Sequence, residues 1–141
     1  TELAAVLSKW RWAQQVIIDT PALCPGRGSQ DPVLATLVRQ RAGLAGVVTL
    51  PANASADHLR EIIAHAACLN LAGLVITKVD ETGSLGAIID VTVDSGLALA
   101  GRYDRRNNAL QPISAWELLA NARRLAKSTL ERKAAQLKVA V

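Results

Sequence analysis

The chain has 141 residues, half of them hydrophobic and a fifth charged, which is typical of one globular domain and excludes a disordered or fibrous chain. Aromatic residues make up only 3% and phenylalanine is absent, which argues against a reader of single-stranded nucleic acid, so we expect no nucleic-acid partner. Two cysteines are too few for a disulfide framework, and no apolar run reaches the roughly 18 residues of a membrane span, so we expect a cytoplasmic protein.

The net charge of +4 belongs to the C-terminal end of the chain. Residues 1–113 hold ten basic and ten acidic residues, whereas residues 114–141 hold six basic and two acidic residues. We therefore divide the chain into a neutral α/β body at 1–113 and a basic, amphipathic C-terminal helix at 114–141 that packs on it. Methionine is absent even at position 1, which leads us to expect a piece of a longer protein.

Helices and strands alternate along the chain. In chain order, we expect a helix over about residues 2–12, a strand at Val16–Ile18, a helix over about 31–41, a strand at Val47–Leu50, a helix from Ser55, a strand at Leu74–Ile76, a helix over about 84–94, a strand at Leu97–Ala100 and a helix from Ser114. The strands are continuous apolar runs, typical of strands buried on both faces, and several helices begin at capping residues. The alternation predicts an α/β fold with a mostly parallel sheet of about four strands and helices on both faces.

Ligand sites of parallel sheets lie beyond the carboxyl ends of the strands. Asp19 and Thr20 follow the first expected strand, and a carboxylate there suits a magnesium ion. The alternative is an Asx-type turn that leads into a loop. The sequence therefore leaves open whether Asp19 is a metal-side residue or a turn residue.

Thr77, Lys78 and Asp80 follow the third expected strand. A carboxylate at this point can accept two hydrogen bonds from the N1–H and N2–H₂ edge of guanine, while the lysine stem lies over the flat ring. The spacing of Lys78 and Asp80 therefore predicts recognition of a guanine nucleotide.

The stretch from Gly73 to Leu97 resembles the guanine-specificity region of the signal-recognition-particle family of GTPases, most closely its flagellar, FlhF-like branch. The matching residues are Thr77, Lys78, Asp80, Glu81, Thr82, Leu85, Gly86, Ala87, Ser95, Gly96 and Leu97. Leu50-Pro51-Ala52 and Leu59-Arg60-Glu61-Ile62 are similar to the strand and helix before that motif, and Asp19-Thr20 falls where the family carries D-T-A-G-R. The resemblance extends over about residues 15–99.

This resemblance implies the C-terminal part of a P-loop NTPase-like G domain. It implies GTP or GDP bound by Thr77, Lys78, Asp80, Asp19 and Gly101, with Asp19 on the side of a Mg²⁺ ion. It also implies a homodimer or a protein partner across the nucleotide face, and a role in placing a flagellar assembly. That role implies a peripheral position at the inner face of the cytoplasmic membrane.

Three features of the family's nucleotide site differ in this chain. The phosphate-binding loop G-x-x-x-x-G-K-S/T is absent. Pro21-Ala22 stands where the family has Ala-Gly, unless Pro21–Pro25 is an insertion and Gly26-Arg27 restores the motif. The loop that closes over the base is replaced by Gly101–Arg106, where only Gly101 corresponds. We therefore expect no catalytic residue and no hydrolysis here, and two alternatives remain: a nucleotide-recognising part of a longer GTPase, or a nucleotide-free pseudo-GTPase that acts as an interaction or scaffold module.

Two further patterns leave alternatives open. His58, His65 and Cys68 recur on one expected helix, where they are either metal ligands or, as we favour, solvated residues at the edge of its core face. The basic residues of the C-terminal helix either form a solvated face, attract an anionic membrane surface, or dock on an acidic partner.

Overall fold

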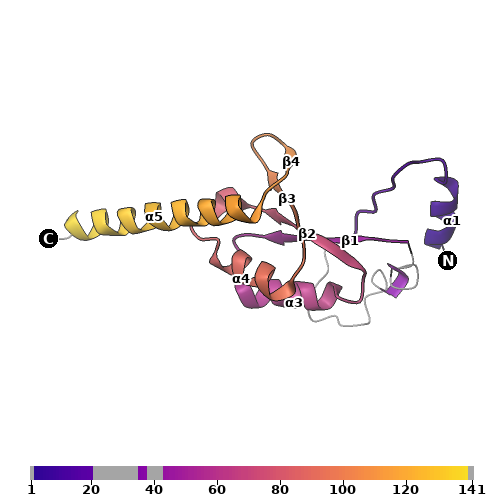
Figure 1. Ribbon diagram of the computed structural model, residues 1–141, viewed down its shortest axis with the longest axis horizontal. Coiled ribbons are helices and arrows are strands. Elements are labelled where there is room, and N and C mark those ends of the chain that lie inside the picture. Colours follow the sequence, from indigo (N-terminus) through magenta and orange to yellow (C-terminus); the bar gives the residue numbers. More distant parts are fainter. Residues whose placement is uncertain (1, 21–34, 38–42, 140–141) are drawn as a thin grey trace.

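The computed structural model describes residues 2–20, 35–37 and 43–139 (Figure 1). Its elements are α1 (Glu2–Lys9), β1 (Gly46–Pro51), α3 (Ala56–Ala66), β2 (Leu71–Thr77), the 3₁₀ turn η2 (Val79–Glu81), α4 (Gly86–Ser95), β3 (Leu99–Asp104), β4 (Ala109–Gln111) and α5 (Ala115–Val139). Most of the helix expected at 31–41, and the altered motif after Thr20, lie outside the described residues.

The four strands form one sheet in the order β1-β2-β3-β4. β1 pairs with β2 and β2 with β3 in parallel, and β3 pairs with β4 in an antiparallel hairpin. The prediction of an α/β fold with a mostly parallel, four-stranded sheet is therefore confirmed.

The membership of the sheet differs from the prediction at both ends of the chain. Val16–Ile18 is not a strand, and the side chain of Ile17 is 85% exposed. A β-branched run favours extended backbone, but it becomes a strand only where a neighbouring strand satisfies its N–H and C=O groups. The fourth strand is instead β4, which pairs with β3 after a turn at residues 105–108. Most of Gly101–Arg106, which was expected to be a loop, belongs to β3, because this strand continues to Asp104.

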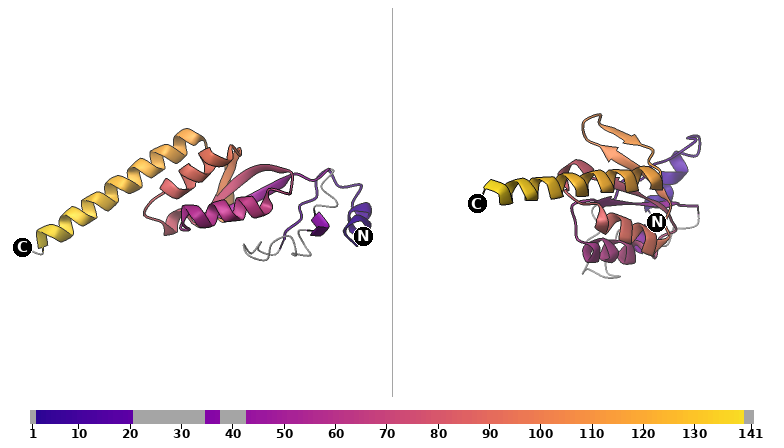
Figure 2. Two further views of the ribbon diagram at one scale, coloured as in Figure 1. Left: turned by 90° about the horizontal axis from the view of Figure 1, so that it is seen from below. Right: turned by 60° about the vertical axis from the view of Figure 1, so that its left-hand side comes forward.

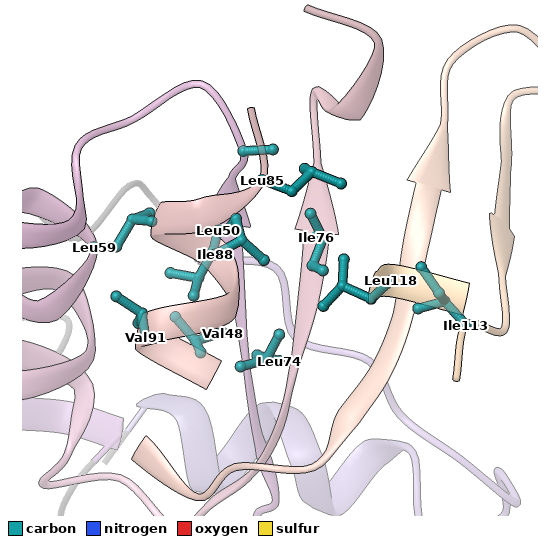
Figure 3. Packing of buried hydrophobic residues seen from close by; sticks show 11 residues of the cluster. Val48, Leu50, Leu59, Leu74, Ile76, Leu85, Ile88, Val91, Ile113 and Leu118 are labelled. Atoms are coloured by element: carbon teal, nitrogen blue, oxygen red, sulfur yellow. The ribbon is translucent and has the colours of Figure 1, made fainter. Parts of the chain in front are cut away.

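The hydrophobic core lies between one face of the sheet and helices α3, α4 and α5 (Figure 3). The register places Val48 beside Leu74 and Leu50 beside Ile76, so these side chains share one face. The buried cluster comprises Val48, Leu50, Ala52, Leu59, Leu74, Ile76, Leu85, Ile88, Val91, Ile113 and Leu118. Because Ile113 and Leu118 belong to this cluster, the core extends to the start of α5.

The prediction of helices on both faces of the sheet is wrong for the described residues, since α3, α4 and the first turns of α5 pack on the same face. β1 shows why: Val48 and Leu50 are buried, whereas Val47 is 53% exposed and Thr49 is exposed. This alternation is typical of a strand with one covered face, and only β2 has the continuous burial of a fully covered strand.

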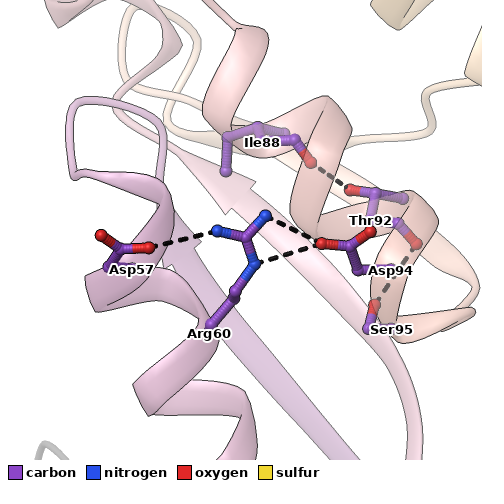
Figure 4. A network of polar contacts seen from close by, with 6 residues as sticks. All are labelled: Asp57, Arg60, Ile88, Thr92, Asp94 and Ser95. Carbon is purple, nitrogen blue, oxygen red and sulfur yellow. Dashed lines mark hydrogen bonds and ion pairs between the residues drawn. The ribbon is translucent and has the colours of Figure 1, made fainter.

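An arginine joins α3 and α4, two of the helices that cover this face (Figure 4). Arg60 of α3 donates to Asp94 Oδ2 of α4 at 2.9 and 3.1 Å, and to Asp57 Oδ1 at 3.2 Å. The hydrogen bond to Asp94 is the main cause that raises the pKa of Arg60 above its ordinary value. The contact orients α3 against α4 at the surface, while the buried side chains between them provide most of the stabilisation.

Among the described side chains, helix α5 contacts the body from Leu118 to Thr129. Leu118 is buried, Ala122 and Leu125 are partly buried against the core, and Thr129 Oγ1 donates to the carbonyl of Gly83 at 3.3 Å. Beyond this point the helix of 25 residues projects from the body (Figures 1 and 2). No helix in the described ranges is both long and apolar enough to cross a membrane.

Candidate functional site

The turn after β2 presents the first group of candidate residues. Thr77 ends the strand, where its carbonyl accepts from Ala52 N–H at 2.8 Å and its hydroxyl donates to the carbonyl of Leu50 at 3.5 Å. These bonds hold the ends of β1 and β2 together. Lys78 then adopts the left-handed conformation with φ 56°, which is uncommon for a residue with a Cβ and starts the turn η2.

The side chains of Lys78 and Asp80 are exposed at this turn. Neither makes a hydrogen bond or an ion pair with any residue that the structure describes. Their charges are therefore free to meet a ligand at the carboxyl end of the central strand, where parallel sheets bind ligands.

A second polar group connects the carboxyl ends of three strands. Asn53, just after β1, donates from Nδ2 to Glu81 Oε2 at 3.1 Å. Arg105, just after β3, lies with Nη1 3.8 Å from Glu81 Oε1. The carboxylate of Glu81 therefore contacts the residues after β1 and β3. Asp80 is the carboxylate of this turn that has no partner among the described residues. This link was not predicted from the sequence, although each of the three residues follows a strand.

Gly101 lies inside the sheet rather than in a loop. It pairs with Val75 of β2 and is buried. A Cβ built on it would lie 2.8 Å from the carbonyl oxygen of Gln111 and 3.2 Å from Leu110 Cδ1. The close approach of β4 therefore requires glycine at this position for packing.

Asp19 does not follow a strand in this structure, because Val16–Ile18 is outside the sheet. The N-terminal segment, drawn in indigo, lies toward the end of the body where β1 begins, opposite the projecting end of α5 (Figures 1 and 2). Lys78 and Asp80 follow the carboxyl end of β2, and no hydrogen bond or ion pair among the described residues joins Asp19 to them. Within the ranges described, no three His, Cys, Asp or Glu side chains gather as a metal site.

The three residues that the sequence left open between metal ligands and edge residues, His58, His65 and Cys68, form no metal-holding group in the part of the chain that the structure describes. His58 Nδ1 lies 4.0 Å from Glu61 Oε2 on α3, and the thiol of Cys68 donates to the carbonyl of His65 at 3.5 Å. Cys68 is exposed and follows the end of α3 at Ala66. Nε2 of His65, by contrast, is buried and makes no hydrogen bond to any described residue, so the expectation of solvated edge residues holds for Cys68 and not for this nitrogen.

The donor set at the strand ends fits one part of a nucleotide. One free carboxylate and one free ammonium match a guanine base, whereas a magnesium ion prefers carboxylates and phosphate oxygens together. Asp19 does not follow a strand, and the sequence has no phosphate-binding loop. Comparison of the sequence with protein-family models and with curated proteins finds no match. Among the described residues, the turn after β2 therefore offers one carboxylate and one ammonium group, and no group of carboxylates gathers there for a magnesium ion.

Proposed function

We propose that this chain recognises the guanine base of GTP or GDP through Lys78 and Asp80, as the C-terminal part of a GTPase domain of the signal-recognition-particle type. One observation carries the proposal: both side chains are exposed and unpaired within the described residues, directly after the buried strand β2. On the resemblance of residues 73–97, the recognition would be linked to the placement and assembly of a flagellum at the membrane. We expect no hydrolysis by this chain, because its sequence has no phosphate-binding loop.

The proposed contacts follow from the chemistry of guanine. Asp80 accepts from the N1–H and N2–H₂ groups, and these hydrogen bonds to a charged acceptor are each worth about 1.5–3 kcal/mol. The stem of Lys78 covers one face of the ring. Glu81 holds the turn through Asn53 and Arg105, which limits the motion of the neighbouring Asp80. Thr77 orients the end of β2 through the bonds that it makes to β1.

The test is a change of base specificity by Asp80→Asn. An asparagine offers one acceptor and one donor, which suits xanthine, where a carbonyl replaces the N2 amino group of guanine. Titration calorimetry should show affinity for GDP reduced about tenfold to hundredfold and affinity for xanthosine diphosphate increased. The control is Asp90→Asn, which removes an exposed carboxylate from α4. Equal GDP affinity for the wild type and Asp80→Asn would contradict the proposal.

A second candidate is a nucleotide-free interaction module. It is favoured because Asp19 follows no strand in the structure and because the sequence has no phosphate-binding loop. The two candidates differ in thermal unfolding with millimolar GTP or GDP and Mg²⁺. A ligand present at about 100 times its dissociation constant stabilises by about 2.7 kcal/mol. An unchanged melting temperature, the same for the wild type and Asp80→Asn, would favour the interaction module.

A further inference from the structure

Helix α5 carries a second apolar stripe that the body does not cover. Its first stripe, formed by Leu118, Ala122 and Leu125, faces the core. The second is formed by Trp116, Leu119, Ala126 and Leu130, which the spacing of three, four and seven residues places on another side of the helix. Trp116 is 78% exposed, Leu119 48% and Leu130 68%.

Basic residues lie within and beside this exposed stripe. Arg123 lies along it, and Lys127 and Lys133 flank it, all of them exposed. The side chains of Arg123 and Lys133 make no ion pair with any described residue, and Lys127 lies 3.9 Å from Glu131 on its own helix. Charge around the stripe is therefore positive and mostly uncompensated.

The arrangement of α5 leaves this stripe open along its length. The helix contacts the body from Leu118 to Thr129, and beyond this point it projects clear of the other elements (Figures 1 and 2). A long, projecting helix with one free apolar side can lie flat on an extended surface.

We propose that α5 docks lengthwise on an anionic lipid surface, with Trp116, Leu119 and Leu130 inserted at the level of the headgroups. An acidic protein groove fits less well, because Arg123 in the middle of the stripe would lose its hydration there, whereas a lipid interface lets an arginine keep its charged end among phosphates. Residues 114–141 hold six basic and two acidic residues, which matches a negative surface. This inference depends on α5 alone and not on nucleotide recognition.

The test measures flotation of the whole chain with lipid vesicles. We expect it to float with phosphatidylcholine vesicles that contain about one third phosphatidylglycerol, and not with phosphatidylcholine alone. High salt should weaken the binding, since the Debye length falls from about 10 Å at 0.1 M to about 3 Å at 1 M salt. In a Trp10→Phe/Trp12→Phe variant, the emission of Trp116 should shift to shorter wavelength when the anionic vesicles are added.

Paired variants test whether binding depends on the residues of this stripe or only on the overall charge and hydrophobicity of the chain. Arg123→Gln should lower the partition coefficient about fivefold, whereas Arg106→Gln, which removes the same charge from the exposed β3–β4 hairpin, should leave it unchanged. Leu130→Ala should lower the partition coefficient about tenfold. This is the change expected if about half of the side-chain carbons that the substitution removes are inserted in the lipid in the wild type. Leu110→Ala, at a residue of similar exposure (60%) on β4, is the matched control.

Three results would overturn the proposal. One is failure of the wild-type chain to float with the anionic vesicles. Another is an equal loss of binding in Arg123→Gln and Arg106→Gln, or in Leu130→Ala and Leu110→Ala. The third is binding to soluble polyglutamate without any flotation, which would assign the stripe to an acidic protein partner.

Discussion

Replacing Gly101 with alanine tests how closely β3 and β4 approach. The added Cβ would lie 2.8 Å from the carbonyl oxygen of Gln111 and 3.2 Å from Leu110 Cδ1. The exposed side chain of Leu110 can rotate away, but the oxygen belongs to the backbone of β4, so the strand itself must move. We expect Gly101→Ala to lower the free energy of unfolding by about 1–3 kcal/mol, the usual cost of overpacking.

The measurement is urea unfolding followed by far-ultraviolet circular dichroism, without nucleotide. The control is Gly86→Ala at the first residue of α4, where the nearest atom to an added Cβ, Ser84 Oγ, is 3.6 Å away. This change should leave the stability unchanged or raise it by up to about 1 kcal/mol. If Gly101→Ala unfolds at the same urea concentration as the wild type, the packing argument is refuted. The ligand role that the family resemblance implies would then be the remaining explanation for the glycine.

Three further predictions concern the core and the helix ends. Ile88→Ala should lower the free energy of unfolding by about 3 kcal/mol, because Ile88 is fully buried; a loss below about 1 kcal/mol in urea would contradict that burial. Ser55→Ala should cost about 1 kcal/mol, since it removes the acceptor for His58 N–H at 3.3 Å, and Ser55→Thr should restore most of it. The N–H and hydroxyl of Ser114 donate to the Glu117 carboxylate and hold the pKa of Glu117 below its ordinary value. The ionised carboxylate therefore stabilises the folded chain above about pH 4.3, and this contribution is lost as the pH falls through the lowered pKa. Urea midpoints of Glu117→Gln should thus depend less on pH in that acidic range than those of the wild type, and parallel curves would contradict the cap.

The sequence predicted the elements that local signals define. Continuous apolar runs located the centres of β1 and β2, because those strands bury consecutive or alternate side chains in the core. Ser55 marks the start of α3, and Ser114 with Glu117 marks the start of α5, because a capping side chain satisfies N–H groups only a few residues away. The position of Lys78 and Asp80 directly after a buried strand was also predicted, since the apolar run Leu74–Ile76 ends just before them.

Tertiary structure alone decided which extended segments became strands. Val16–Ile18 has the composition of a strand and is outside the sheet, whereas Ala109–Gln111 became β4 by pairing with β3. Strand formation depends on a partner distant in sequence, and composition does not encode where that partner lies. The same reason explains why the link from Asn53 through Glu81 to Arg105 was missed: it exists only once β1, β2 and β3 are aligned in register.

The C-terminal helix also combines a property that was predicted from the sequence, its net charge, with one that only the tertiary structure decided, its exposed side. Counting residues places the net charge of +4 in residues 114–141, because a count needs no structure. Which side of α5 meets the body was decided by the packing of Leu118 and Leu125, and this packing leaves Trp116 and Leu130 exposed. A helix with two apolar stripes can bury either one against a core, so only the contact with the core determined which stripe remains free for a partner.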